Sequence, residues 1–321
     1  MATVIDEADS GGDVFAPRRR WRRWLLPLLL LLPVPWLVLS PPRTRPESGQ
    51  LRVTFLDVGQ GDSAVIEGPT GTVVVIDGGG RPGADETRGE DPGSRVVVPY
   101  LRSCGINRVD LLVATHPDDD HIQGLSAVAT RLAAPRGALI CGYPGPSAPY
   151  HRLISVLRGR NVPLYVGRRG QRIDLGGGAR LEVLAPTDRP IVTGHSLTNN
   201  NCLVIRLVYQ RARFLFTGDA EGEEEADMLA DPHCDLSADV LKVGHHGSRW
   251  SSTAAFLQAV HPSVGIISAG LHNTYGHPHA EVLERLRQIG AVIYRTDRQG
   301  AITVATDGTR LHFITTTPDR R

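Results

Sequence analysis

The sequence predicts an α/β fold in one large domain that follows an apolar N-terminal segment. From Leu51 onward, short runs of β-branched and apolar residues alternate with amphipathic stretches of helical period. The chain has 321 residues and 41% apolar side chains, which is enough to bury a sizeable core. Its first predicted strand is followed by two more strands and not by a glycine-rich dinucleotide fingerprint. This order argues against a doubly wound nucleotide-binding domain.

The N-terminal region divides into a basic tail (1–23), an apolar stretch (24–39) and a linker rich in proline and polar residues (40–50), ahead of the domain (51–321). The apolar stretch contains three prolines and falls just short of the ~20 residues that span a bilayer comfortably. Five arginines precede it and predict a cytoplasmic N-terminus. We therefore expect a membrane anchor with the domain on the extracytoplasmic side. The alternative is a cleaved signal peptide that releases a secreted domain.

Within the domain, the patterns predict twelve strands and six helices. The strands are expected at 52–56, 64–67, 73–76, 111–114, 139–142, 181–184, 203–208, 214–217, 240–243, 264–268, 291–294 and 301–305. The helices are expected at 94–102, 122–131, 151–158, 222–230, 253–259 and 280–289. Several of these helices follow strands that end in His or Asp, so we expect polar side chains to collect along one edge of the fold.

The charge distribution indicates no broad nucleic-acid-binding surface, and the cysteine spacing indicates no disulfide-stapled fold. The first 50 residues hold seven basic and five acidic residues, which leaves 28 basic and 29 acidic residues in the domain. A nearly neutral domain offers no broad basic surface for a phosphate backbone, so a nucleic-acid substrate would have to be recognised at the site itself. The four cysteines form no CxxC pair and predict no disulfide framework.

The strongest chemical signal is the segment Thr115-His116-Pro117-Asp118-Asp119-Asp120-His121, which joins a predicted strand to a predicted helix. Divalent ions bind several deprotonated N or O donors at about 2 Å, and two ions can share a cluster when one carboxylate bridges them. An acidic turn that caps a helix would explain Asp119 or Asp120. It would not explain two histidines flanking three carboxylates, so the segment predicts a metal centre.

This segment resembles the His-x-His-x-Asp-His motif of the metallo-β-lactamase superfamily, with Asp118 in place of the second His. Further segments resemble, in order, those of the C-terminal domain of the ComEC family of DNA-internalisation competence proteins. They are Asp57-Val58-Gly59-Gln60-Gly61-Asp62, Val75-Ile76-Asp77-Gly78-Gly79, Asn199-Asn200-Asn201, Phe216-Thr217-Gly218-Asp219, Leu241-Lys242-Val243-Gly244-His245-His246-Gly247-Ser248 and Tyr275-Gly276-His277-Pro278. The resemblance extends from Leu51 to about Phe313 and implies an αββα sandwich.

The resemblance also implies roles for individual residues. The expected metal ligands are His116, Asp118, Asp120, His121, Asp219, His246 and His277, with Asp219 bridging two ions. Asp120 and one of His245 and His246 are the expected catalytic residues, and spacing does not decide between the two histidines. Asp62, Asp77 and Asn201 are expected to hold the ligands in place. Lys242, Asn200 and Ser248 are expected to contact the substrate.

The expected ligand set combines three carboxylates with two to four imidazoles and contains no thiolate. Such a set suits Mn²⁺ as well as Zn²⁺, and we expect two ions, with Mn²⁺ slightly favoured. The implied function is that of a metal-dependent phosphodiesterase or nuclease, with single-stranded DNA as a candidate substrate. One alternative is a hydrolase of a lactone, thioester or β-lactam. The other is a non-catalytic DNA-handling module that retains the metal site. The sequence names no protein partner.

Overall fold

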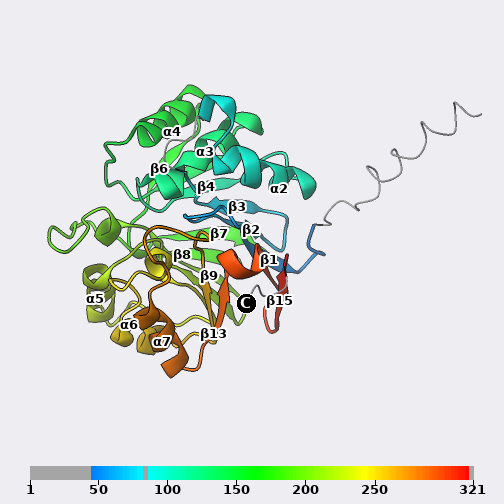
Figure 1. The fold of residues 1–321 in the computed structure, drawn as a ribbon. Coiled ribbons are helices and arrows are strands. Elements are labelled where there is room, and N and C mark those ends of the chain that lie inside the picture. The colour runs from blue at the N-terminus through cyan, green and yellow to red at the C-terminus, as the bar shows by residue number, and fades with distance from the viewer. Residues whose placement is uncertain (1–44, 82–85, 318–321) are drawn as a thin grey trace, which may run out of the picture. The chain divides into compact units, whose positions relative to one another are not determined.

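The computed structural model describes residues 45–81 and 86–317 of the chain (Figure 1). The predicted basic tail, the predicted membrane anchor and the first part of the linker lie outside the described residues. Among the helices of the described ranges, none combines the length and the apolar character needed to cross a membrane.

The described residues form two mixed β-sheets. In the first sheet the strand order is β15-β14-β1-β2-β3-β4-β5-β6, and in the second it is β13-β12-β11-β10-β9-β8-β7. The first sheet comprises β1 (Leu51–Phe55), β2 (Ala64–Glu67), β3 (Val73–Ile76), β4 (Leu111–Ala114), β5 (Gly137–Ile140), β6 (Leu164–Val166), β14 (Ile302–Thr306) and β15 (Leu311–Thr315). The second comprises β7 (Arg172–Gly176), β8 (Ala179–Ala185), β9 (Val204–Tyr209), β10 (Ala212–Phe216), β11 (Val240–Lys242), β12 (Val264–Ile267) and β13 (Val292–Arg295).

Helices cover the outer face of each sheet, as Figure 1 shows. The first sheet carries α2 (Val98–Ser103), α3 (Asp119–Arg131) and α4 (Ala148–Gly159), and the second carries α5 (Gly222–Ala230), α6 (Ala254–Val260) and α7 (Ala280–Gln288). The remaining short helical segments are η1 (Glu86–Arg88), η2 (Gly93–Val97), η3 (Asn199–Asn201), η4 (Gly244–Gly247) and α8 (Thr296–Gln299). The layers are therefore helix, sheet, sheet and helix, which agrees with the predicted sandwich.

Three hydrophobic clusters hold these layers together. The central cluster lies between the sheets, where the rings of Phe55 on β1 and Phe216 on β10 stack at 5.7 Å. A second cluster joins the first sheet to α2, α3 and α4, and a third joins the second sheet to α5, α6 and α7. Strands β2 and β3 are buried along their whole length, as expected for apolar runs covered on both faces.

The predicted elements agree closely with the structure in the buried layers. Strands 64–67, 73–76 and 111–114 and helix 222–230 have the predicted bounds. Three strands were not predicted: β6, β7 and β15 are short or half-exposed and lack a clear apolar alternation. Helix α3 begins at Asp119, three residues before the predicted start, because Asp118 has the extended backbone of an N-cap. Asp120 and His121 therefore lie in the first turn of α3.

Gly124 lets α3 pack directly against the backbone of two neighbouring segments. A Cβ added at Gly124 would overlap the carbonyl oxygen of Gly78 and lie 2.6 Å from the backbone nitrogen of Gly93. We expect Gly124→Ala to lower the free energy of unfolding by about 2 kcal/mol, because this clash outweighs the roughly 1 kcal/mol gain in helix propensity.

Urea unfolding checks this, with Gly159→Ala as the control, since a Cβ added at Gly159, the last residue of α4, meets no atom within 4 Å. Equal free energies of unfolding for the two variants would contradict the packing argument.

Candidate metal centre

The predicted metal-binding residues meet at one edge of the sandwich. β3, β4, β5 and β6 run parallel to one another in the first sheet, and β10, β11, β12 and β13 do so in the second. The carboxyl ends of parallel strands share an edge, and ligands are commonly bound there. Asp77 follows β3, His116 follows β4, Asp219 follows β10 and His246 follows β11. The two sheets thus bring together residues that are far apart in the sequence.

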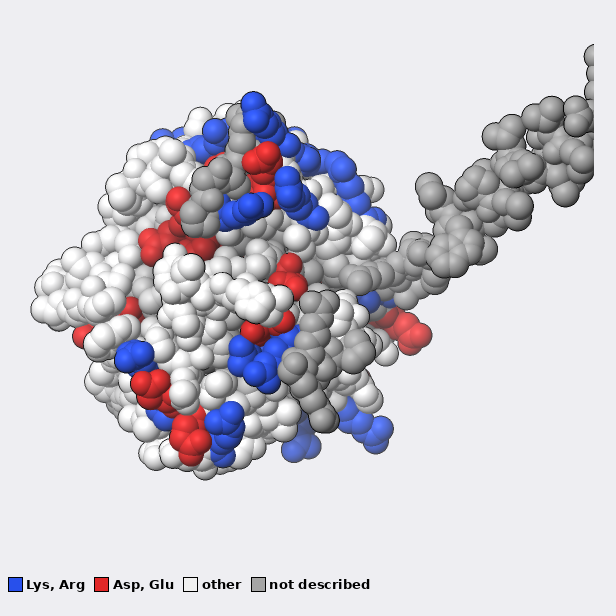
Figure 2. Space-filling model, viewed as in Figure 1, with Lys and Arg blue, Asp and Glu red and all other residues white. Residues whose placement is uncertain are grey.

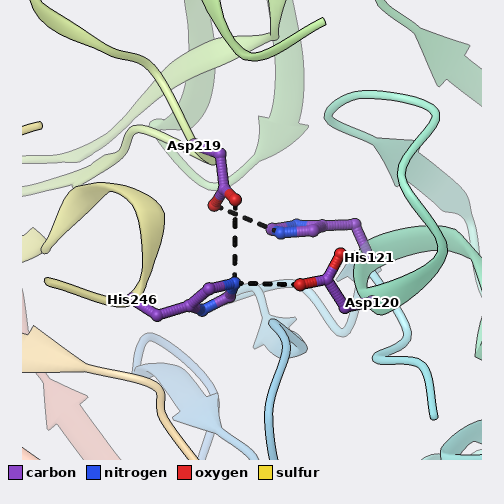
Figure 3. A group of neighbouring side chains, drawn as sticks. All are labelled: Asp120, His121, Asp219 and His246. Carbon is purple, nitrogen blue, oxygen red and sulfur yellow. Dashed lines mark hydrogen bonds and ion pairs between the residues drawn. The ribbon is translucent and has the colours of Figure 1, made fainter. Parts of the chain in front are cut away.

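Four of these side chains form the centre of the cluster: Asp120, His121, Asp219 and His246 (Figure 3). Each offers one ligand atom, and these atoms all lie within 4.8 Å of one another. His121 Nε2 lies 3.2 Å from Asp219 Oδ1, and His246 Nε2 lies 3.3 Å from Asp120 Oδ2 and 3.7 Å from Asp219 Oδ2. Nitrogen and oxygen atoms that converge in this way form a set that a divalent cation can bind.

His116 and Asp118 extend the cluster on the other side of Asp219. His116 Nε2 lies 3.9 Å from Asp219 Oδ2 and 3.7 Å from Asp118 Oδ2, and the rings of His116 and His121 are 4.1 Å apart. The imidazole of His116 is buried, whereas 42% of the Asp118 side chain is exposed. Asp219 is the carboxylate that both halves of the cluster share.

Two buried carboxylates hold the histidines from behind. Asp77 Oδ2 lies 2.9 Å from His121 Nδ1, and Asp77 also accepts hydrogen bonds from the backbone nitrogen (2.9 Å) and the hydroxyl (2.7 Å) of Thr115. Asp62 Oδ1 lies 3.3 Å from His246 Nδ1, and the carbonyl of Ser268 lies 3.0 Å from the same nitrogen. A carboxylate or carbonyl at Nδ1 sets the tautomer that leaves Nε2 free for a metal. Both Nε2 atoms point into the cluster.

Burial and charge shape the ionisation of these groups. Burial lowers the pKa of His116 to about 3, so its imidazole is neutral and its Nε2 carries a free lone pair. For His246, burial opposes protonation, but Asp219 and Asp62 raise its pKa to about 10. Burial likewise opposes ionisation of Asp120, yet the hydrogen bond with His246 and the charge of His121 keep its pKa below the usual range. The carboxylates of Asp62, Asp120 and Asp219 thus stay ionised within the cluster, where they attract positive charge.

Unpartnered polar atoms show that the cluster fits a cation. His116 Nε2, His121 Nε2 and Asp219 Oδ1 are buried and have no hydrogen-bond partner outside the cluster, in which His121 Nε2 and Asp219 Oδ1 lie 3.2 Å apart. Buried polar groups are nearly always hydrogen-bonded, and each exception calls for a ligand, an ion or a water. All three atoms are ligand types that Zn²⁺ and Mn²⁺ accept. The residues present therefore fit divalent metal ions.

The segment after β11 holds His245 and His246 in an uncommon backbone conformation. Their φ angles are 47° and 54°, in the left-handed region that residues with a Cβ seldom adopt. His246 is buried, and its Nε2 faces Asp120 and Asp219. His245 has 21% of its side chain exposed and places Nε2 3.6 Å from Asp219 Oδ2. Both histidines therefore reach the cluster, His246 from the interior and His245 from the solvent side.

His277 lies at the rim of the cluster, with its ring centre 5.5 Å from that of His245 and 6.1 Å from that of His246. Its Nδ1 lies 3.5 Å from the side-chain nitrogen of Gln60. His277 is therefore near the predicted ligands without being part of the tight group of four.

Four other predicted residues have protein partners for their polar side chains. The side chain of Asn201 bonds to the backbone of Ile191 and Leu197, so it closes a loop and holds no metal ligand. Lys242, Asn200 and Ser248, the predicted substrate contacts, are at most 3% exposed, and their contact with a substrate stays a prediction. Lys242 pairs with Asp62, and Asn200 bonds to Glu223 and to the backbone of Glu224. Polar side chains that are buried at the end of a strand or at the start of a helix are nearly always hydrogen-bonded within the protein.

Glu221 and Thr115 also contact residues of the site, although no sequence pattern indicates this. Glu221 is 1% exposed, and its Oε1 lies 3.3 Å from His245 Nδ1 and 3.4 Å from the side-chain nitrogen of Asn199. It also serves as the N-cap of α5, which is the role that an acidic residue before a helix normally suggests. Thr115 lies within the metal-binding motif, but no sequence pattern predicts that its hydroxyl donates to Asp77. Asn199, and not Asn200 or Asn201, is the member of the asparagine run that reaches the cluster.

The fold and the site define a class of protein. The sequence profile of the Metallo-beta-lactamase superfamily matches residues 56–271, and the chain belongs to this superfamily. Among solved structures, the chain is similar to CmlA, a diiron beta-hydroxylase from Streptomyces venezuelae, with a TM-score of 0.52. Sequence identity there is 14%, and the match covers 80% of this chain and 54% of that one. This likeness is one of fold alone.

The relatives in sequence include a competence protein, ComA, and the predicted resemblance to the ComEC family is confirmed. The chain is 31% identical over 268 residues to the ComE operon protein 3 of Bacillus subtilis (strain 168), covering 79% of this chain and 33% of the relative. It is 32% identical over 296 residues to the competence protein ComA of Neisseria gonorrhoeae, covering 86% of this chain and 37% of the relative. The chain thus spans about a third of the length of these relatives.

Proposed function

We propose that this protein is a phosphodiesterase or nuclease that acts on DNA with two divalent metal ions, Mn²⁺ or Zn²⁺, at the cluster around Asp219. The observation that carries the proposal is the convergence of His116 Nε2, His121 Nε2 and Asp219 Oδ1, which have no hydrogen-bond partner outside the cluster, within a carboxylate-rich site. The similarity to competence proteins supports DNA as the substrate class. A location on the extracytoplasmic side of a membrane is part of the same proposal and rests on the N-terminal sequence.

The predicted ligands divide into two groups that share Asp219. Asp120, His121 and His246 would hold one ion, and His116 and Asp118 the other, with His277 at the rim. Such ions supply an activated water and stabilise charge on phosphate oxygens. The residues of the chain bind and orient these ions, and Asp77 and Asp62 keep the histidine rings in place.

His245 is the better placed of the two histidines to move a proton. Its side chain is partly exposed, whereas both ring nitrogens of His246 face protein groups. Glu221 Oε1 lies 3.3 Å from His245 Nδ1 and orients the ring, so that Nε2 would give a proton to the leaving oxygen of the substrate. His245 is therefore assigned as the general acid and His246 as a metal ligand.

The test is cleavage of a fluorescent single-stranded DNA oligonucleotide by the full chain with added Mn²⁺ or Zn²⁺. We expect metal-dependent cleavage that falls more than about 100-fold in Asp120→Ala, because even residues that only orient metal ligands cost about 10- to 100-fold when removed. Asp119→Asn is the matched control, since Asp119 neighbours Asp120 but is outside the cluster.

Turnover of a lactone or of nitrocefin without DNA cleavage would contradict the proposed substrate. Metal binding without turnover of any of these compounds would contradict the proposed catalysis.

A further inference from the structure

Two exposed aromatic side chains stack on histidines next to the metal centre. The rings of Trp250 and His195 lie 4.9 Å apart at an angle of 15°, and those of Tyr275 and His277 lie 5.7 Å apart at 20°. Trp250 is 52% exposed and Tyr275 is 60% exposed. Each pair thus presents a large, nearly flat aromatic surface to solvent.

Both pairs border on His245, the partly exposed histidine of the cluster. His195 Nδ1 lies 3.4 Å from Glu221 Oε1, the atom that also lies 3.3 Å from His245 Nδ1. The ring of His277 lies 5.5 Å from the ring of His245. Two stacks from different loops therefore lie next to the residue that faces both the solvent and Asp219.

The loops that carry these rings are fixed by hydrogen bonds to backbone atoms. The carbonyl of Trp250 accepts a hydrogen bond from the backbone nitrogen of Gly222 at 3.0 Å. On the other loop, the Asn273 side chain donates to the carbonyls of Gly270 (2.9 Å) and His277 (2.6 Å) and accepts from the His277 nitrogen (2.9 Å). Rings on loops that are already ordered lose little conformational entropy when a ligand binds.

The charge of the domain makes contacts of this kind necessary for a DNA substrate. Basic and acidic residues are nearly equal in number beyond residue 50, and Figure 2 shows both interspersed among uncharged areas on the face in view. The arginine that precedes Trp250, Arg249, is exposed but lies 3.8 Å from Glu281. Attraction of phosphates by the surface is therefore weak, and affinity has to come from the metal centre and from contacts to the bases.

We propose that Trp250 and Tyr275 are stacking platforms for unpaired nucleobases, so that the site selects single-stranded DNA. The proposal rests on the proposed function, because it assigns the substrate of the same site. Aromatic side chains stack on every base through its π face, which gives affinity without sequence preference. In a duplex the base faces are covered by neighbouring pairs, so the platforms would have no partner there.

The experiment measures steady-state cleavage of a single-stranded oligonucleotide by the full chain, with the same strand carrying abasic sites as a second substrate. We expect Trp250→Ala and Tyr275→Ala each to raise KM for the normal strand about 10-fold with kcat unchanged. This is the kinetic result of losing a contact that binds the substrate and the transition state equally well. Neither variant should change cleavage of the abasic strand, because no base is present to stack.

Three further variants separate stacking from other causes. Trp250→Phe and Tyr275→Phe keep a flat ring and should retain a KM near that of the wild type. Tyr165→Ala removes an aromatic ring with a similar exposure of 56% on β6, away from the cluster, and should change nothing.

The outcomes distinguish this inference from the proposed function. Wild-type cleavage with unchanged KM in both alanine variants, or equal cleavage of duplex and single strand, would overturn the stacking proposal alone. A wild-type protein that cleaves no DNA strand with either metal would overturn the proposed function and the inference with it.

Discussion

Asp219→Ala is expected to remove both metal ions and to lower activity by at least about 1000-fold. Among the described residues, Asp219 is the one carboxylate that lies within 4.0 Å of four cluster histidines, and these come from both halves of the site. Without it, His116 on one side and His121 and His246 on the other have no shared oxygen. Losing a shared ligand disrupts both sites, whereas Asp120 contacts His246 alone.

The measurement is metal content after dialysis, together with the cleavage rate. The wild type should retain two ions, Asp120→Ala one, and Asp219→Ala none. Asp188→Ala, which removes a carboxylate that is 91% exposed, controls for surface charge and should match the wild type. Equal metal content in Asp219→Ala and Asp120→Ala would show that Asp219 is not a shared ligand.

Lys242→Met is expected to lower the free energy of unfolding by about 3–5 kcal/mol. Lys242 is the only lysine of the chain, is 3% exposed and pairs with Asp62, which is 6% exposed. Burial opposes ionisation of Asp62, but Lys242 and His246 lower its pKa to about 2, so this carboxylate is charged at neutral pH. Removing the lysine deprives this buried carboxylate of its closest charged partner and leaves it beside the imidazoles of His121 and His246, which is the costly way to break such a pair.

Urea unfolding in the presence of a chelator checks this without the contribution of bound metal. Asp62→Asn added to Lys242→Met should recover most of the loss, because the remaining charge is then removed as well. Arg172→Met serves as the comparison, since its side chain is 74% exposed and its ion pair with Glu182 contributes less than about 1 kcal/mol. A decrease of under 1 kcal/mol in the free energy of unfolding of Lys242→Met would contradict this prediction, because other groups would then compensate the charge of Asp62.

Local patterns in the sequence were sufficient for the buried layers and for the residues that bear the chemistry. Runs such as 73–76 and 111–114 are apolar because both faces of each strand are covered, so their bounds can be predicted from composition. His116, Asp120 and His121 lie within six positions of one another, and their concentration of ligand types is visible without a fold. By contrast, the edge strands β6 and β15 have no such pattern, because only part of each is buried.

The sequence by itself determined the class of fold, the metal-binding motif and the set of candidate ligands, since these depend on residue type and short-range spacing. Only the tertiary structure decided which partners meet. It placed His246 3.3 Å from Asp120, 126 positions away, paired Lys242 with Asp62 and brought Glu221 to His245. It also turned Asn200 and Asn201 away from the site. These pairings depend on how the two sheets pack face to face. A contact between distant segments produces no periodic pattern in the sequence, so the sequence alone does not predict it.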